Sequence, residues 1–156
     1  MRIEIIAVGK RMPGWVDEAF GEYRKRFDRS LEVSLKEVDA IRRSASITVP
    51  RAVQEESKRL AAAVAPGNQL ICLDERGQSW STQQLSKQLD KWMHSGRNVS
   101  LLVGGADGMS DQLLHSAERT WSLSALTLPH PLVRVILIEQ LYRGWSLLQN
   151  LPYHRS

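Results

Sequence analysis

The chain has 156 residues, of which 42% are hydrophobic and 24% charged, and its formal net charge is +4 at pH 7. This composition excludes an intrinsically disordered chain, and the length suits a single globular domain with one hydrophobic core. The mild basic excess suits an acidic partner such as RNA without requiring one. With one cysteine no internal disulfide can form. Because signal-peptide and membrane-helix patterns are also missing, we expect a cytoplasmic protein.

The first half of the chain predicts strands and helices in alternation. Residues 3–8 form a short apolar, β-branched run that predicts a strand. Apolar residues spaced by four over 15–27 predict a helix, and the alternation over 31–35 predicts a half-exposed strand. Residues 40–46 are polar and basic and predict a mobile loop. A second helix is expected over 50–64, with proline in its first turn.

The next part of the chain continues the alternation. Residues 69–73 predict a third strand, residues 81–96 a helix ended by glycine, and residues 99–103 a fourth strand. Strands that alternate with helices predict an α/β domain with a mostly parallel sheet flanked by helices.

The last predicted helix, residues 132–148, is apolar on nearly every side. A helix with one buried face would instead carry a polar stripe over about half its girth. We therefore expect burial on two sides, against the sheet of its own chain and against a second subunit. The preceding segment, 121–131, is irregular and ends in Pro-His-Pro.

The glycine-rich segment 104–108 follows the fourth strand and has two interpretations. It either makes a tight turn or allows a ligand to approach the backbone closely. It lacks the spacing of a dinucleotide-binding fingerprint, and Gly9-Lys10-Arg11 lacks that of a phosphate-binding loop. Cys72 lies in an aliphatic run and is expected to be a buried, unreactive thiol. The four histidines have no metal-ligand spacing, so we expect no metal site.

Four segments carry a resemblance to a known family. They are residues 7–15 with AVGK, MP and W, residues 100–108 (SLLVGGADG), residues 121–134 (WSLSALTLPHPLVR) and residues 152–155 (PYHR). Together they resemble the ribosomal RNA large subunit methyltransferase H family of the SPOUT class, over essentially the full chain. The long and chemically unusual run 121–134 is the most specific of the four.

The resemblance implies a SPOUT fold, in which the C-terminal part of a parallel sheet domain forms a deep trefoil knot. It implies a single domain over residues 1–156, with a knotted cofactor-binding part at about 70–156. It also implies a homodimer, S-adenosyl-L-methionine as methyl donor, and the ribosome as partner. The implied target is N3 of a pseudouridine in the helix 69 loop of 23S rRNA.

Carried over position by position, the resemblance predicts eight cofactor-binding residues: Leu73, Gly104, Leu123, Ser124, Ala125, Leu126, Thr127 and Leu128. Apolar walls with exposed main-chain donors and acceptors suit an adenine ring, and glycine permits close backbone approach. The alternative is that these leucines belong to the hydrophobic core.

Loss of the N3 proton requires a base or nearby cationic groups. We expect His130, held between two prolines, and the tail residues His154 and Arg155 to be catalytic, with the tail reaching over a site of its own chain or of the partner. Tyr153 and Arg134 are the expected substrate-binding residues. The alternatives are a capping histidine, a disordered terminus, and an Arg134 or Arg143 paired with Glu139 inside the helix.

Two other functions remain open from the sequence. One is a ribosome-associated RNA-binding protein without catalytic activity, and the other is a SPOUT methyltransferase acting on another RNA such as tRNA. The basic side chains Arg42 and Arg43 fit either an rRNA contact or a solvated surface.

Overall fold

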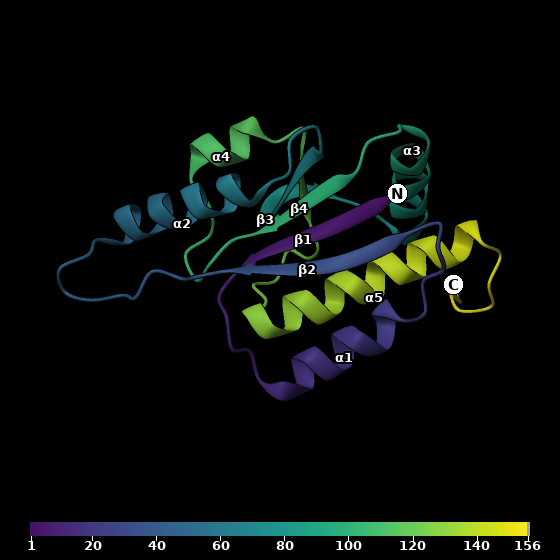
Figure 1. The fold of residues 1–156 in the computed structure, drawn as a ribbon, viewed down its shortest axis with the longest axis horizontal. Coiled ribbons are helices and arrows are strands. Elements are labelled where there is room, and N and C mark those ends of the chain that lie inside the picture. Colours follow the sequence, from purple (N-terminus) through teal and green to yellow (C-terminus); the bar gives the residue numbers. More distant parts are fainter. Residues whose placement is uncertain (156) are drawn as a thin grey trace.

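The computed structural model describes residues 1–155 and shows a five-stranded sheet between two layers of helices (Figure 1). The strands are β1 (Arg2–Val8), β2 (Glu32–Val38), β3 (Gln69–Ser79), β4 (Val99–Val103) and β5 (Arg119–Ser122). They are ordered β2-β1-β4-β3-β5, and every neighbouring pair is parallel. The predicted fold class, an α/β domain with a parallel sheet flanked by helices, is confirmed.

The helices cover both faces of the sheet (Figure 1). They are α1 (Gly14–Arg24), α2 (Val49–Ala63), α3 (Thr82–His94), α4 (Asp111–Ser116) and α5 (His130–Leu148). Helices α1, α3 and α5 pack into one core, and α2 and α4 pack into the other. Across residues 1–155, no helix has the length and apolar character that a membrane crossing demands.

The central strand β1 shows why the two layers form. Ile3 and Ile5 pack into the core beneath α1, α3 and α5, whereas Ile6 and Val8 pack into the core with α2 and α4. All four side chains are buried. A strand covered on both faces needs a continuous apolar run, which is the pattern observed in this part of the sequence.

Helix starts follow from local capping. The Ser81 side chain accepts a hydrogen bond from the backbone N–H of Gln84, and the Gln84 side chain accepts one from the backbone N–H of Ser81, forming a capping box. At α2, the Thr48 hydroxyl accepts from the N–H of Arg51, and Pro50 lies in the first turn. These caps lie close to the helix starts expected from the sequence.

The sequence did not predict three features of the C-terminal half. The short helix α4 and the strand β5 were not expected, and β3 extends well beyond residue 73. Both Leu73 and Gln78 pair with Trp121 of β5, so residues 74–77 bulge out of the ladder between them. The extension of β3 could not be predicted from the polar residues after Leu73, because a bulge interrupts the alternation of apolar and polar residues by which strands are recognised in a sequence.

Helix α5 is buried mainly by its own chain. It packs along both α1 and α3, and its residues Leu137, Ile138 and Leu141 are fully buried. Within its own chain the helix thus packs against the sheet and against two neighbouring helices, and its predicted burial against a second subunit stays a prediction. Leu132, at the start of the helix, remains 41% exposed.

Candidate functional site

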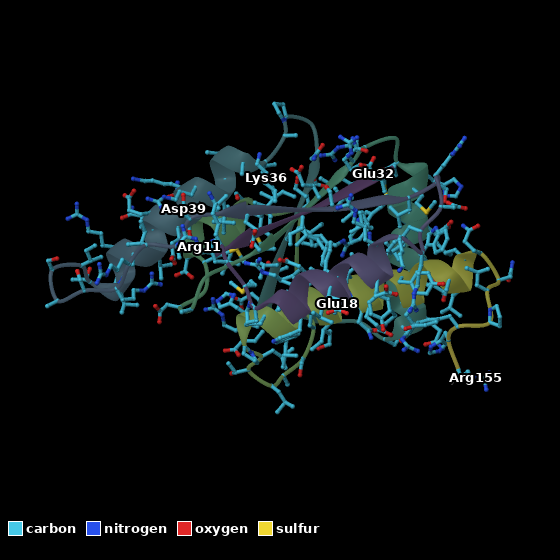
Figure 2. The ribbon with its side chains drawn as sticks, turned by 60° about the horizontal axis from the view of Figure 1, so that its bottom comes forward. Arg11, Glu18, Glu32, Lys36, Asp39 and Arg155 are labelled. Carbon is cyan, nitrogen blue, oxygen red and sulfur yellow. The ribbon has the colours of Figure 1, made fainter. Side chains whose placement is uncertain are left out.

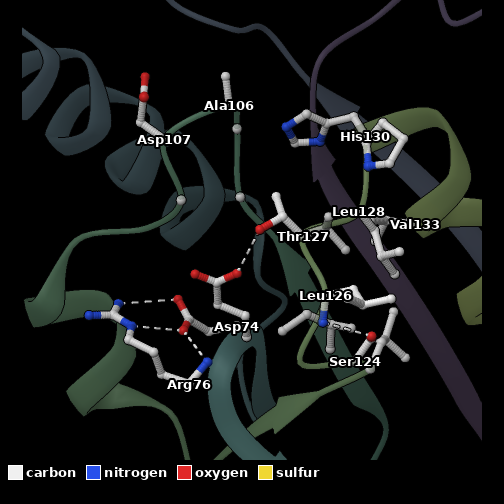
Figure 3. A pocket seen from close by; sticks show the side chains of 18 of the residues that line it. Asp74, Arg76, Ala106, Asp107, Ser124, Leu126, Thr127, Leu128, His130 and Val133 are labelled. Atoms are coloured by element: carbon white, nitrogen blue, oxygen red, sulfur yellow. Dashed lines mark hydrogen bonds and ion pairs between the residues drawn. The ribbon is translucent and has the colours of Figure 1, made fainter.

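A cleft of about 1060 Å³ lies where β3, β4 and β5 give way to loops (Figure 3). It is lined by residues 73–76, 103–108, 123, 124, 126–131 and 133. Ligands of open parallel sheets bind outside the carboxyl ends of the strands, which is where this cleft is found. The site is therefore built from the β3 bulge, the loop after β4 and the loop between β5 and α5.

The loop after β4 (residues 104–108, hereafter the glycine loop) folds back tightly on itself. Gly105 and Gly108 form an isolated bridge, in which the Gly108 N–H donates to the Gly105 carbonyl at 3.0 Å. A Cβ atom on Gly104 would lie 2.8 Å from the carbonyl carbon of Gly108 and from the Met109 side chain. The tight-turn interpretation of this segment is thus confirmed, and the segment also forms a wall of the cleft, while close approach of a ligand stays a prediction.

The β3 bulge adds charged groups that the sequence did not single out. Arg76 donates two side-chain hydrogen bonds, of 2.9 and 3.2 Å, to the carboxylate of Asp74. These bonds hold the pKa of Asp74 below its usual range. Glu75 accepts a hydrogen bond of 3.2 Å from the Thr127 hydroxyl, which joins the bulge to the opposite loop (Figure 3). In the sequence, the Asp-Glu-Arg-Gly run directly after a buried strand could have indicated these charged residues of the cleft.

The loop between β5 and α5 forms the other wall. Leu126 is 74% exposed at the cleft, and its N–H donates to the Ser124 hydroxyl at 2.9 Å. Leu123 and Leu128 are half-buried and also line the cleft. An exposed leucine held in a hydrogen-bonded loop does not belong to the core, so the core alternative does not apply to Leu126.

Seven of the eight expected cofactor-binding residues line this one cleft. They are Leu73, Gly104, Leu123, Ser124, Leu126, Thr127 and Leu128. Ala125 lies in the same loop but does not line the cleft, and its side chain is exposed.

His130 is the first residue of α5 and lines the cleft (Figure 3). Pro129 and Pro131 flank it and fix the backbone on both sides. Its Nδ1 atom is buried and has no hydrogen-bond partner among residues 1–155. A buried ring nitrogen without a partner is rare in folded proteins and is a candidate for a ligand contact.

Arg134 lies outside the cleft lining and is fully buried. Its guanidinium pairs with the carboxylate of Glu37 and donates to the backbone carbonyls of Val8 (3.2 Å) and Gly9 (2.7 Å). It therefore ties the N-terminal part of α5 to the carboxyl ends of β1 and β2. The ion pair with Glu139 that the sequence left open is made by Arg143.

The C-terminal tail turns back along α5. Asn150 adopts a left-handed conformation with φ 55°, and the N–H of Leu151 donates to the Ser146 carbonyl at 2.9 Å. The Tyr153 hydroxyl donates to Glu139 at 3.0 Å, and His154 Nδ1 lies 3.4 Å from Arg143. The tail of the described chain is thus docked on α5.

The tyrosine of the tail is held in its neutral form. Burial, with further contributions from Tyr23 and Glu139, raises the pKa of Tyr153 well above its usual range. Its ring stacks edge-on against Tyr142, with centroids 4.7 Å apart. A neutral phenol keeps its proton and can donate it in a hydrogen bond at any physiological pH.

The structure does not bring the tail and the cleft together within one chain. Glu139, the contact of Tyr153, follows His130 by nine residues, which is about 13 Å along a helix. Arg155 lies at the end of the molecule away from Arg11, which follows the carboxyl end of β1 (Figure 2). His154 and Arg155 therefore lie far from the cleft of their own chain.

This chain belongs to the SPOUT methyltransferase family, because the family model described as predicted SPOUT methyltransferase matches residues 1–154. Over 156 residues it is 50% identical to the ribosomal RNA large subunit methyltransferase H of Thioalkalivibrio sulfidiphilus, and the match covers 100% of both chains. The family resemblance drawn from four sequence segments is thereby confirmed. Within residues 1–155, no group of histidine, cysteine and carboxylate side chains is arranged to hold a metal ion.

Proposed function

We propose that this protein transfers a methyl group from S-adenosyl-L-methionine to N3 of a pseudouridine in the helix 69 loop of 23S rRNA, within the assembled ribosome. Family membership and the name of the full-length relative support methylation of rRNA. The observation that carries the proposal is the cleft itself, where a glycine loop, a charged bulge and an exposed leucine loop converge.

The residues of the cleft fit this donor. Its volume of about 1060 Å³ is at the upper end of the range for small-molecule sites. Because Gly104 has no side chain, a ligand can contact its backbone directly. Leu123, Leu126 and Leu128 supply apolar contacts for an adenine ring. The carboxylate of Glu75 at the cleft favours a cationic ligand.

The donor supplies a methyl group on a sulfonium, and the protein supplies positioning and proton transfer. His130 lines the cleft beside the loop between β5 and α5, so we assign it the removal of the N3 proton. His154 and Arg155 supply hydrogen bonds and positive charge that favour loss of that proton. Tyr153 contacts the RNA, and Arg134 supports binding indirectly by fixing the N-terminal part of α5.

The position of the tail supports a homodimer as part of this proposal. The tail and the cleft are separated within one chain, so a second copy is needed to bring His154 and Arg155 to a cleft. Leu132 and Ile136 lie one turn apart on α5 and keep part of their surface exposed, which offers an apolar contact for that copy. The proposal also includes the trefoil knot in residues 70–156, the single-domain organisation and a cytoplasmic location beside the ribosome.

The test has two parts. Calorimetry with S-adenosyl-L-methionine and with its demethylated product, S-adenosylhomocysteine, measures donor binding. Purified ribosomes from cells lacking the gene are then incubated with the protein and isotopically labelled donor, and the methylated nucleotide is located by mass spectrometry. Label on the helix 69 pseudouridine is the expected result. Label on tRNA or on another rRNA nucleotide would contradict the assigned substrate, and failure to bind the donor would contradict the activity.

A further inference from the structure

Arg43 connects three segments of the chain through its guanidinium. It lies in the loop between β2 and α2 (residues 39–48, hereafter the β2–α2 loop). It donates to the Ile41 carbonyl at 2.7 Å, to both carboxylate oxygens of Glu56 at 2.9 and 3.0 Å, and to Asp107 at 2.9 and 3.1 Å. Ile41 belongs to the same loop, Glu56 to α2, and Asp107 to the glycine loop of the cleft.

Glu56 is the buried centre of this network. Its side chain is 1% exposed, and one of its carboxylate oxygens also accepts the backbone N–H of Ile41 at 2.9 Å. A buried carboxylate is stable only when its charge is paired and its lone pairs are hydrogen-bonded. Arg43 is the residue that pairs with it, so the position of Arg43 is set by burial rather than by surface attraction.

The glycine loop rests directly on this carboxylate. A Cβ atom on Gly105 would lie 2.6 Å from a carboxylate oxygen of Glu56. The next residue of α2, Ser57, accepts the backbone N–H of Ser110 at 2.9 Å, just after the glycine loop. The glycine loop is thus held against α2 at both of its ends. The ion pair between Arg43 and Asp107 adds a third attachment.

We propose that Arg43 is a positioning residue, which fixes the glycine loop for donor binding and makes the β2–α2 loop and the cleft respond to each other. This inference rests on the proposed function, because it presumes that the donor occupies the cleft. Arg43 lies outside the cleft lining and acts through Asp107 and Glu56. It is therefore not available as a phosphate contact, one of the two interpretations left open for it by the sequence.

The neighbouring Arg42 provides a matched control. It carries the same charge in the same loop and makes no side-chain hydrogen bond or ion pair within residues 1–155. Arg42→Gln and Arg43→Gln therefore remove equal charge. A difference in ligand affinity between the two variants is then due to the hydrogen bonds and ion pairs of Arg43.

The affinity for S-adenosylhomocysteine is measured by calorimetry for the wild-type protein, Arg42→Gln, Arg43→Gln, Asp107→Asn and the double variant Arg43→Gln/Asp107→Asn. We expect Arg43→Gln to weaken binding roughly tenfold, within the usual range of coupling between sites, and Arg42→Gln to leave it unchanged. The double variant should bind no more weakly than the weaker of the two single variants, because both act on one network.

Hydrogen exchange with and without S-adenosylhomocysteine separates coupling from simple structural support. In the wild-type protein the ligand should slow exchange in residues 104–110 and also in the β2–α2 loop. In Arg43→Gln the protection of the β2–α2 loop should be lost. If unpaired Glu56 prevents Arg43→Gln from folding, the variant Arg43→Gln/Glu56→Gln removes both charges and should fold while binding weakly.

Wild-type affinity in the folded Arg43 variants, additive losses in the double variant, or no ligand-induced protection of the β2–α2 loop in the wild-type protein would each overturn the inference. Failure of the wild-type protein to bind S-adenosylhomocysteine would instead contradict the proposed function. The two failures are therefore distinguishable.

Discussion

Gly104 and Gly105 of the cleft are required for space, whereas Gly108 is required for its left-handed backbone conformation, with φ 80°. Gly104 and Gly105 do not adopt positive φ, but a Cβ atom on either would collide with Gly108 or with Glu56. Because the colliding atoms at Gly104 are mainly backbone, they cannot rotate away as a flexible side chain would. A larger residue at position 104 must therefore displace the glycine loop itself.

We expect Gly104→Val to lower donor affinity at least tenfold, which corresponds to about 1.4 kcal/mol. Gly14→Ala is the control, because nothing lies within 4 Å of a Cβ atom at that position. Calorimetry with S-adenosylhomocysteine measures both variants, after thermal unfolding has shown that they are folded. Equal affinities would mean that Gly104 does not approach the donor.

Cys72 was expected to be an unreactive thiol, and the structure gives the reason. The side chain is fully buried in the core beside α2 and α4, and burial raises the pKa of its thiol to about 12. The thiolate is the reactive form, so at any pH well below 12 the group stays protonated and inert. Reactivity should appear only when the core opens.

A thiol-reactive chromophore at pH 8 should therefore label the native protein very slowly and the protein in guanidinium chloride completely. The absorbance of the released thiolate measures both rates. Methyl transfer by Cys72→Ser should remain, since the sulfur takes no part in it. Rapid labelling of the native protein would show that the thiol is accessible and that this part of the core is open.

At the scale of elements, the contact between α3 and α5 depends on one glycine. A Cβ atom on Gly144 would lie 2.9 Å from Leu89 Cδ1 and 3.3 Å from Leu85 Cγ. Glycine normally destabilises a helix interior, so its presence here reflects packing. Small residues at a helix crossing let two helices approach closely. The approach keeps α5, and with it His130, in place at the cleft.

Gly144→Ala and Gly21→Ala make the same change in two helices. Nothing lies within 4 Å of a Cβ atom on Gly21, so alanine should stabilise α1 by up to about 1 kcal/mol. At Gly144 the gain in helix propensity is opposed by overpacking, which typically costs about 1–3 kcal/mol. Urea denaturation measures both free energies of unfolding. Equal stabilisation in the two variants would show that α3 and α5 have room to separate.

At the scale of the whole molecule, the two groups of expected catalytic residues lie apart. His130 lines the cleft at the start of α5, whereas His154 is docked beside Arg143 near its other end. Within one chain, the tail therefore does not reach the cleft. A symmetric dimer supplies both if the tail of one subunit serves the cleft of the other.

Replacing His154 and Arg155 together by alanine should abolish methyl transfer and leave donor affinity and the dimer intact. Co-expression of this variant with Gly104→Val, assayed at a donor concentration well below the weakened dissociation constant of Gly104→Val, tests which cleft the tail serves. If it serves the partner, mixed dimers hold one complete site, and random pairing should restore about a quarter of wild-type activity. A tail that serves its own chain would give no recovery, and unimpaired turnover in the tail variant would exclude its role altogether.

Much of the fold was determined by the sequence alone, because short-range patterns specify it. The apolar run of β1, the alternation of β2 and the capping residue Ser81 each act over a few residues, and their order along the chain predicts a parallel α/β sheet. The family resemblance likewise named residues that share one cleft, since seven of the eight expected cofactor-binding positions line it; that they bind the donor stays a prediction.

Only the tertiary structure decided which distant residues meet. Arg43 reaches Asp107 across 64 positions and Arg134 reaches Gly9 across 125, and no local pattern records either pairing. The bulge of β3 likewise depends on its neighbour β5. These contacts are selected by the need to pair charges and backbone groups once the core has buried them, and that need arises only after the strands have assembled.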